Sequence, residues 1–414
     1  MSVRPLTGVR LLDLSRVVAG PTCCFWLAAL GAEVIRIESP GGDIGWQTYP
    51  RVGPDGEHYG PLRERDIPLS PLRKNRGKRS VVLDLQTPAG RDVLLQLVAH
   101  SDVLIENFKP GSMASWGLDW PTLEATNPRL IYATITGYGW HGPYRDKPAM
   151  DPIVQAVSGL MARTGQRDGP PTRVAATIGD QLPGMWVAVG VLAALRQREL
   201  DGRGQAIDVA MLDALVALSW DDPLDLYEDQ GIPERFGSGD PRGGPFGVYQ
   251  SADSWVALAA PSDPMWARLA PIVGGAALDE RWTIHRERAV HQDELNEVIE
   301  AWTRARSTDE IVDELERHGV PVGRVNPPWW ARHDPHIEQR GTLERLRHPD
   351  LDQPTTWLGP ALPIRFTRAA IDTAPAEPLG ASTDAVMREL LGLDDTTIEA
   401  LREKGAFGPV TERC

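Results

Sequence analysis

The stretch GVRLLDLSRVVAGPTCCFWLAALGAEVIRIE (8–38) decides how this chain begins to fold. A strand pattern over Gly8–Leu14 is followed by an apolar helix pattern over Pro21–Leu30 and a second strand pattern over Glu33–Glu38. Two strands joined by one helix within about thirty residues form a right-handed βαβ unit with parallel strands. The stretch therefore predicts an α/β fold.

The same alternation continues downstream. We expect a helix from Pro88 to His100, a strand over Val103–Glu106, a helix over Trp120–Thr126 and a strand over Leu130–Thr136. Repeated alternation of strands and helices predicts a Rossmann-like, doubly wound parallel sheet.

A second, smaller unit is expected after this sheet, because 414 residues with 42% hydrophobic content exceed the usual size of a single core. The segment Asp222–Gly244 is rich in Asp, Pro and Gly and is typical of a linker. Beyond it the patterns predict a hairpin of Phe246–Gln250 with Trp255–Ala259, helices over Pro264–Ile272 and Gln292–Arg304, a capped helix starting at Ser307, and a strand over Pro321–Val325. A final pair of helices is predicted over 383–391 and 395–403.

Composition excludes several classes of protein. The net charge of −14 and the pI near 5.2 argue against a nucleic-acid partner. Cys23, Cys24 and Cys414 have neither metal-ligand spacing nor the pattern of a disulfide framework, so we expect no metal and a reducing compartment. The longest apolar run, Met185–Leu195, is shorter than a membrane span, and no signal-peptide pattern occurs near Arg4. These features predict a cytoplasmic enzyme without a membrane partner.

One motif points misleadingly to a dinucleotide. GYGWHG (137–142) matches G-x-G-x-x-G after a predicted strand. Pro143 and Pro148 prevent a long helix from starting there, and no acidic ribose ligand follows. We therefore expect no nicotinamide cofactor.

Asp180 is the strongest candidate for a functional residue. It lies in AATIGDQLPG (175–184), at or just before a helix pattern that runs from Pro183 to about Leu200. A carboxylate at a helix N-terminus is either a cap or a group with a chemical role. Because Asp is already anionic at neutral pH, it can act as a nucleophile without a partner base, and no Ser-His-Asp constellation is evident in the sequence.

Several segments together resemble one enzyme family. They are LTGVRLLDLS (6–15), LGAEVIRIESP (30–40), NRGKRSVVLD (75–84), DVLIENFKPG (102–111), GPPTRVAATIGD (169–180), GRGQAIDVAMLDA (202–214) and PFGVYQSAD (245–253). The chain is similar in these segments to the class III coenzyme A (CoA) transferases. That family includes formyl-CoA:oxalate and carnitine CoA transferases and the 2-methylacyl-CoA racemases.

The resemblance implies a domain arrangement and an oligomer. Residues 1–222 would form the first part of a large Rossmann-like domain, residues 223–330 a smaller α+β domain, and residues 331–414 the return to the large domain. Two subunits of the family interlock like links of a chain, so the resemblance also implies a homodimer.

The resemblance implies a mechanism at Asp180. Its carboxylate would attack an acyl-CoA to give a mixed anhydride, the released thiolate would convert this into an aspartyl-CoA thioester, and a carboxylic acid would reverse the sequence. The partners are then an acyl-CoA donor and a carboxylic acid acceptor. CoA thioester is a substrate, and no permanently bound cofactor or metal is required.

The resemblance also carries a set of CoA- and substrate-binding positions. They are Val18, Ala19, Leu83, Asp84, Gln86, Asn107, Phe108 and Lys109, with Met150 and Asp151 nearby. Gly243 and Gly244 are either a flexible flap over the site or a plain interdomain turn. The basic run Arg73–Arg79 is either a solvated loop or a contact for CoA phosphates.

Two positions separate the branches of the family. Racemases carry a proton-exchanging His where this chain has Met150, which cannot carry a proton. Asp151 either positions the nucleophile or the acceptor, or caps a helix before Pro152. Val18 and Ser39 replace a Gln and an Arg of the formyl-CoA branch, which disfavours an oxalate-type substrate. We expect a class III CoA-transferase; a 2-methylacyl-CoA racemase and a non-catalytic acyl-CoA-binding protein are the alternatives.

Overall fold

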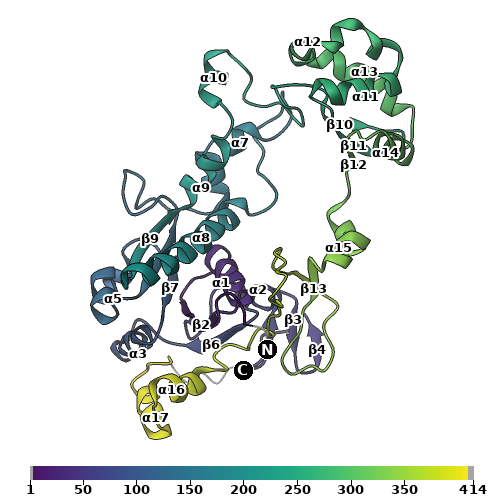
Figure 1. Cartoon of the computed structure of the whole chain (residues 1–414). Coiled ribbons are helices and arrows are strands. Elements are labelled where there is room, and N and C mark those ends of the chain that lie inside the picture. The colour runs from purple at the N-terminus through teal and green to yellow at the C-terminus, as the bar shows by residue number, and fades with distance from the viewer. Residues whose placement is uncertain (1–2, 409–414) are drawn as a thin grey trace. The chain divides into compact units, whose positions relative to one another are not determined.

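The structure, a computed structural model, describes residues 3–408 (Figure 1). Internal contacts divide the chain into two compact units. The first comprises the described parts of Met1–Ser158, Ala175–Leu218 and Asp334–Cys414, and the second comprises Gly159–Val174 and Ser219–His333. The sequence-based boundaries at 222 and 330 leave residues 159–174 with the large domain. These residues join the second unit because the Arg235 guanidinium donates hydrogen bonds to the carbonyls of Ala162, Gln166 and Gly169.

A six-stranded sheet organises the first unit. Its strand order is β6-β2-β1-β7-β8-β9, and every neighbouring pair is parallel. The strands are β1 (Arg10–Asp13), β2 (Glu33–Glu38), β6 (Lys78–Val82), β7 (Val103–Glu106), β8 (Ile131–Thr136) and β9 (Gln205–Ala210). The expected α/β fold with a parallel sheet is therefore confirmed. The order is that of Rossmann-type sheets. Successive strands are added on one side of β1 up to β6 and then on its other side from β7 onward, so the strand order switches between β1 and β7.

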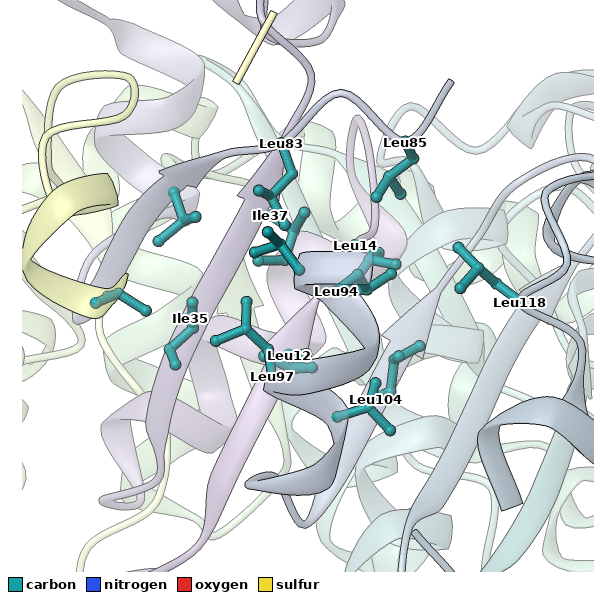
Figure 2. Packing of buried hydrophobic residues seen from close by; sticks show 14 of the residues in the cluster. Leu12, Leu14, Ile35, Ile37, Leu83, Leu85, Leu94, Leu97, Leu104 and Leu118 are labelled. Atoms are coloured by element: carbon teal, nitrogen blue, oxygen red, sulfur yellow. The ribbon is translucent and has the colours of Figure 1, made fainter. Parts of the chain in front are cut away.

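Both faces of this sheet are covered by helices. On one face, α3 (Pro88–Ala99), α5 (Trp120–Thr126) and α16 (Thr383–Leu391) bury a leucine-rich cluster against the strands. Figure 2 shows Leu94 and Leu97 of α3 packed over Leu12, Leu14 and Ile37. The helices α1 (Ala19–Ala29) and α8 (Ile178–Asp201) contact each other and the strands β1, β2, β8 and β9. Cys23 and Cys24 of α1 are buried free thiols, as expected of small core residues; Cys414 lies outside the described residues.

Short elements complete the first unit. The antiparallel sheet β4-β3-β5 lies in the chain between β2 and β6 and was not predicted. Its strands have only two or three residues, too few for a periodic pattern. The remaining elements include β3 (Arg51–Gly53), β4 (Gly56–His58), β5 (Ile67–Pro68), α2 (Leu69–Lys74), α4 (Ser112–Ser115), α6 (Asp151–Val157), α9 (Met211–Ser219), α15 (Pro335–Arg340), the hairpin β13 (Leu343–Arg345) with β14 (Leu358–Pro360), and α17 (Asp395–Glu403).

The second unit is an antiparallel sheet packed against helices around its own core. β10 (Phe246–Gln250), β11 (Trp255–Ala259) and β12 (Val322–Arg324) form the sheet, so the predicted hairpin is confirmed. Its helices are α7 (Leu160–Arg163), α10 (Leu224–Asp229), α11 (Asp263–Val273), α12 (His285–Val290), α13 (Gln292–Arg304) and α14 (Thr308–Arg317). The expected capping box forms between Ser307 and Glu310 at the start of α14.

Helix α8 is longer than the apolar run seen in the sequence. With 24 residues it is long and apolar enough to cross a membrane by length and composition alone. It packs on α1, α6 and the strands β8 and β9, as a core helix of a folded domain does.

Candidate active site

The loop that leaves β1 is held at almost every backbone position by a side chain. Asp13 Oδ1 accepts a hydrogen bond from the N–H of Ser15 at 3.0 Å. The Asn107 side chain binds both backbone polar groups of Arg16. Its Oδ1 accepts a hydrogen bond from the Arg16 N–H at 2.7 Å, and its Nδ2 donates one to the Arg16 carbonyl at 2.9 Å. Asn107 follows β7, so these hydrogen bonds link the ends of β1 and β7, between which the strand order switches. Ligands of doubly wound sheets bind at such a switch point.

Val17, the next residue, has an unusual backbone conformation. Its φ of 67° is in the left-handed region, which a β-branched residue rarely adopts. The N–H of Val17 donates to Asp43 Oδ2 and its carbonyl accepts from Lys74 Nζ, both at 2.9 Å. Strain of this kind persists where the surroundings impose it, and it clusters at functional sites.

A buried ion network supports this loop from below. Arg36 pairs with Asp13 at 3.1 Å, with Glu38 at 3.1 Å and with Asp43 at 3.4 Å, and Lys78 pairs with Asp13 at 2.8 Å. Burial opposes the ionisation of Asp13, but Lys78 and Arg36 hold the pKa of this carboxyl well below its usual range. The network fixes Asp43, and through it the N–H of Val17.

A cavity of about 50 Å³ opens at the switch point. Its lining consists of Leu14, Ser15, Arg16, Arg36, Ile37, Glu38, Ser39, Asp43, Leu83, Asp84, Leu85, Gln86, Phe108 and Trp116. Four of these, Leu83, Asp84, Gln86 and Phe108, are among the positions proposed from the sequence. Of the other proposed positions, Asn107 binds the backbone of Arg16, and Lys109 is exposed outside the lining. Val18 and Ala19 also lie outside it, as the N-cap and the first residue of α1.

Two aromatic rings and a guanidinium form one wall of this cavity. The Arg16 guanidinium lies 4.8 Å from the centroid of the Phe108 ring. Phe108 in turn meets Trp116 edge to face, with ring centroids 5.2 Å apart. A cation over an aromatic ring at this distance is attracted by the π face, so the Arg16 side chain has a defined place at the cavity.

Asp180 is the third residue of α8, and the capping alternative for it does not hold. The N-cap position belongs to Thr177, and within the described chain the Asp180 carboxylate accepts no hydrogen bond from the helix. The helix starts five residues before the predicted start at Pro183, which places Asp180 inside the first turn. Its side chain is half-buried.

Asp151 supplies the cap instead. It is the first residue of α6, it is buried, and its Oδ1 accepts a hydrogen bond from the Gly179 N–H at 2.8 Å. The Gln155 side chain donates to both carboxylate oxygens, at 3.0 and 3.1 Å. A Cβ on Gly179 would lie 2.8 Å from Val154 Cγ2, so only glycine allows α6 to approach α8 this closely.

The surroundings of Asp180 make its carboxylate unusually basic. Burial and, to a smaller extent, the nearby Asp151 carboxylate raise the pKa of Asp180, Lys74 lowers it, and together they bring it to about 6. At neutral pH this carboxyl is mostly ionised. Perturbed groups of this kind cluster at functional sites.

Helices α1 and α8 meet next to Asp180. A Cβ on Gly184, one turn after Asp180, would lie 2.7 Å from the Ala19 carbonyl oxygen. This close approach brings the start of α1, the strained loop at Val17 and the first turn of α8 into one region of the first unit, together with Lys74.

Three sequence-proposed positions remain, two in the second unit and one at the start of α6. Gly243 and Gly244 are buried in the second unit, where Cβ atoms on them would lie 2.8 Å from His285 and 3.1 Å from Gln292. Met150 is exposed at the start of α6.

The basic run Arg73–Arg79 does not gather into a phosphate-binding patch. Arg76 pairs with Glu344 and stacks on Phe25, and Lys78 belongs to the buried network of Asp13. Lys74 points to the Val17 loop. The solvated-loop alternative also fails for these residues, because Arg76 and Lys78 are buried.

The metal and dinucleotide alternatives meet two local features of the described residues. Across 3–408, no group of three or more His, Cys, Asp and Glu side chains is placed to hold a metal ion. The GYGWHG segment is followed by turns, and the next helix, α6, begins only at Asp151.

Sequence reasoning missed Val17, Asp43, Arg16 and Lys74. Nothing in a sequence signals a positive φ at a valine. Lys74 is part of the basic run Arg73–Arg79, but nothing in that run distinguishes Lys74 from Arg76 and Lys78, which are buried.

Comparisons with known proteins agree with one another. The family model CoA-transferase family III matches residues 6–383. The succinyl-CoA–D-citramalate CoA-transferase of Chloroflexus aurantiacus is 36% identical over 97% of this chain and 98% of that protein. The succinate–glutarate CoA-transferase of Agrobacterium fabrum is 34% identical over 95% and 97%. The crystal structure of a CAIB/BAIF family protein from Brucella suis superposes with a TM-score of 0.79 at 31% identity, covering 94% of this chain and 100% of the other.

Proposed function

The chain belongs to CoA-transferase family III and is a CoA-transferase, and on that premise we propose that it moves CoA from an acyl-CoA donor to a carboxylic acid through covalent intermediates on Asp180. One observation carries this proposal: Asp180 is half-buried at the start of α8, and Asp151 performs the capping that would otherwise occupy it. A carboxylate without a structural duty, ionised at neutral pH, suits nucleophilic attack on a thioester.

The first half-reaction transfers CoA to the enzyme. An Asp180 carboxylate oxygen attacks the thioester carbonyl carbon, the carbon–sulfur bond breaks, and CoA leaves as the thiolate. The thiolate then attacks the Asp180 carbonyl carbon of the mixed anhydride, which releases the donor acid as a carboxylate and leaves an aspartyl-CoA thioester. The acceptor carboxylate reverses both steps, so that acyl-CoA product and free Asp180 are formed. The N-terminal dipole of α8 favours the negative charge that develops there.

CoA contacts belong to the switch-point cavity in this proposal. Its volume of about 50 Å³ takes only part of a CoA molecule, since pockets that enclose a ligand measure ~300–1,000 Å³. The loop from Ser15 to Ala19 leads from this cavity to the first turn of α8, so a CoA thioester lying along the loop reaches Asp180. No metal or permanently bound cofactor takes part.

The test is CoA exchange followed by mass spectrometry. Purified protein is incubated with a panel of acyl-CoA donors and carboxylic acids, with succinyl-CoA as the first donor because the relatives above include a succinyl-CoA transferase. Formation of new acyl-CoA species by the wild-type protein, and not by Asp180→Ala, supports the proposal. Hydrolysis without exchange, or equal exchange by both proteins, contradicts it.

A homodimer is part of the same proposal. Helices α6 and α8 expose large apolar side chains, among them Ile153, Val157, Met185, Trp186 and Val189. Side chains this apolar on two adjacent helices mark a contact surface, and a second copy of the chain is the occupant that the family resemblance implies. Light scattering should give twice the chain mass for the wild type, and Trp186→Glu should lower it. A monomeric wild-type protein contradicts the dimer and leaves the chemistry untouched.

The buried thiols Cys23 and Cys24 suit a reducing compartment such as the cytoplasm.

A further inference from the structure

The ammonium group of Lys74 has fixed hydrogen bonds but no carboxylate partner. Lys74 is the last residue of α2, and its Nζ donates to the Val17 carbonyl at 2.9 Å and to Ser70 Oγ at 3.2 Å. An ammonium has three N–H donors. Among residues 3–408, no carboxylate lies within ion-pair distance of Lys74, whereas Arg36 and Lys78 in the same region have direct carboxylate partners.

This charge is costly in its present surroundings. Burial lowers the pKa of Lys74, and the more distant carboxylates Asp43 and Asp180 only partly compensate. Asp43 is itself engaged by Arg36 and by the N–H groups of Val17 and Gly45. A half-buried cation without a direct partner gains more from an anion than an exposed cation does.

The space beside Lys74 is small, about the size of one water molecule or one carboxylate oxygen. A cavity of about 10 Å³ is lined by Val17, Arg36, Ser70 and Lys74 together with neighbouring residues. That volume admits about one water-sized group. Arg36 in this lining is already paired with carboxylates, so Lys74 is the cation that a negatively charged oxygen would meet here.

The same ammonium interacts electrostatically with Asp180. In the exchange reaction the acyl group and the acceptor acid successively occupy the place beside Asp180. A diacid brings a second negative charge to a centre that already contains Asp180 and Asp151, and this charge needs a cation nearby.

We infer that Lys74 is a specificity-determining residue that binds the second carboxylate of a dicarboxylic acyl group or acceptor, so that this enzyme selects dicarboxylic over monocarboxylic acids. The inference rests on the proposed function of Asp180. It adds to that proposal the class of acid, dicarboxylic, and the residue that binds the second carboxylate, Lys74.

The experiment compares two acids with the same four-carbon chain. Exchange of ¹³C-labelled succinate with succinyl-CoA and of ¹³C-labelled butyrate with butyryl-CoA is measured separately, so that each assay contains one acid only. The proteins are the wild type, Lys74→Met, Lys74→Arg and the matched control Arg73→Met. Arg73 lies on the same helix, is exposed, and donates a hydrogen bond to the Leu358 carbonyl.

The expected result is a selective loss. Lys74→Met should lower kcat/KM for succinate about 10- to 100-fold, the range of one charge-assisted hydrogen bond, mainly through KM. Butyrate exchange should change by less than about threefold, since butyrate has no group for Lys74 to bind. Lys74→Arg should retain most of the succinate activity, and Arg73→Met should behave as wild type with both acids.

Other results have distinct meanings. Equal loss for both acids in Lys74→Met, with the acid limb of the pH profile moved upward, would assign Lys74 to the ionisation of Asp180 and overturn the inference. A wild-type enzyme that exchanges butyrate as well as succinate also overturns it. If the wild type exchanges neither acid nor any other in the panel, the proposed function itself fails. Because Lys74→Met also removes the hydrogen bond to the Val17 carbonyl, Lys74→Gln serves as a second check: its amide can donate to that carbonyl but has no charge. Lys74→Gln should lose succinate exchange as Lys74→Met does, and wild-type succinate exchange by Lys74→Gln would overturn the inference.

Discussion

The Asp151 carboxylate accepts a 2.8 Å hydrogen bond from the Gly179 N–H, the second residue of α8. A residue of another helix thus satisfies a free N–H group at this helix end, a task usually performed by the N-cap side chain. Asp180, one residue later, remains available for chemistry, and it feels the negative charge of Asp151 from close by.

Asp180→Asn should abolish CoA exchange and stabilise the fold at neutral pH. The folded-state pKa of about 6 exceeds the unfolded value of 3.8, so ionised Asp180 destabilises the native state once the pH rises above about 4. Removing the charge should increase the free energy of unfolding by about 1–2 kcal/mol at pH 7.5, after allowance for solvent screening, and by nothing at pH 3.5. Thermal unfolding of both proteins at both pH values measures this. A lower Tm for Asp180→Asn at pH 7.5 would show that the carboxylate has a structural duty.

The rate of exchange should fall at acidic pH with an apparent pKa near 6, because only the ionised Asp180 attacks the thioester. Asp151→Asn retains an oxygen acceptor for the Gly179 N–H but removes the negative charge, so the acid limb should move to lower pH. A profile of kcat/KM between pH 4.5 and 8 for both proteins checks this. An unmoved limb would mean that Asp151 does not influence the nucleophile.

Asp151→Ala is the companion variant. It removes the acceptor as well and leaves the Gly179 N–H without this partner, which should cost about 1–3 kcal/mol of stability. Chemical denaturation of Asp151→Ala and Asp151→Asn separates the hydrogen bond from the charge. Equal stability of the two variants would indicate that water replaces the lost acceptor.

Acyl-CoA without an acceptor acid should leave a covalent adduct on Asp180, since a ping-pong enzyme stalls without its second substrate. Hydroxylamine should then inactivate the enzyme only when donor is present. Trypsin should release the peptide that follows Arg173 and ends at Arg196, and mass spectrometry should place a hydroxamate on Asp180 within it. A label on Asp151 or on a cysteine would identify a different nucleophile.

No deuterium should enter the α-position of a 2-methylacyl-CoA kept with the enzyme in heavy water. Proton exchange by a racemase needs a base and an acid, and Met150 supplies neither. Proton NMR of the recovered thioester gives the readout. Incorporation with formation of both epimers would restore the racemase alternative.

The local patterns of the sequence were sufficient for most of the large elements. The strands β2 and β7 and the helices α5, α16 and α17 have the predicted bounds. The strands are short, almost fully buried runs, and the helices are bounded by capping and turn residues that the sequence shows. The sheet of β3, β4 and β5 escaped prediction because strands of two or three residues have no period to read. Residues 159–174 group with the second unit, whereas the sequence-based boundary at 222 leaves them with the first, because Arg235, which binds them, lies far along the chain.

The sequence by itself determined the parallel α/β fold, the family, and Asp180 as a carboxylate near the start of an apolar helix. Only the tertiary structure decided what that carboxylate is free to do. A helix N-terminus has several N–H groups that compete for acceptors, and which acceptor binds them depends on residues brought close by folding. Here Asp151 comes from 28 residues upstream of Gly179. In the same way, Lys74 and Val17 are 57 residues apart in the chain, and their hydrogen bond exists only because folding brings the end of α2 to the loop that follows β1. Hydrogen bonds and charge interactions act through space, so they cannot be read from the order of residues alone.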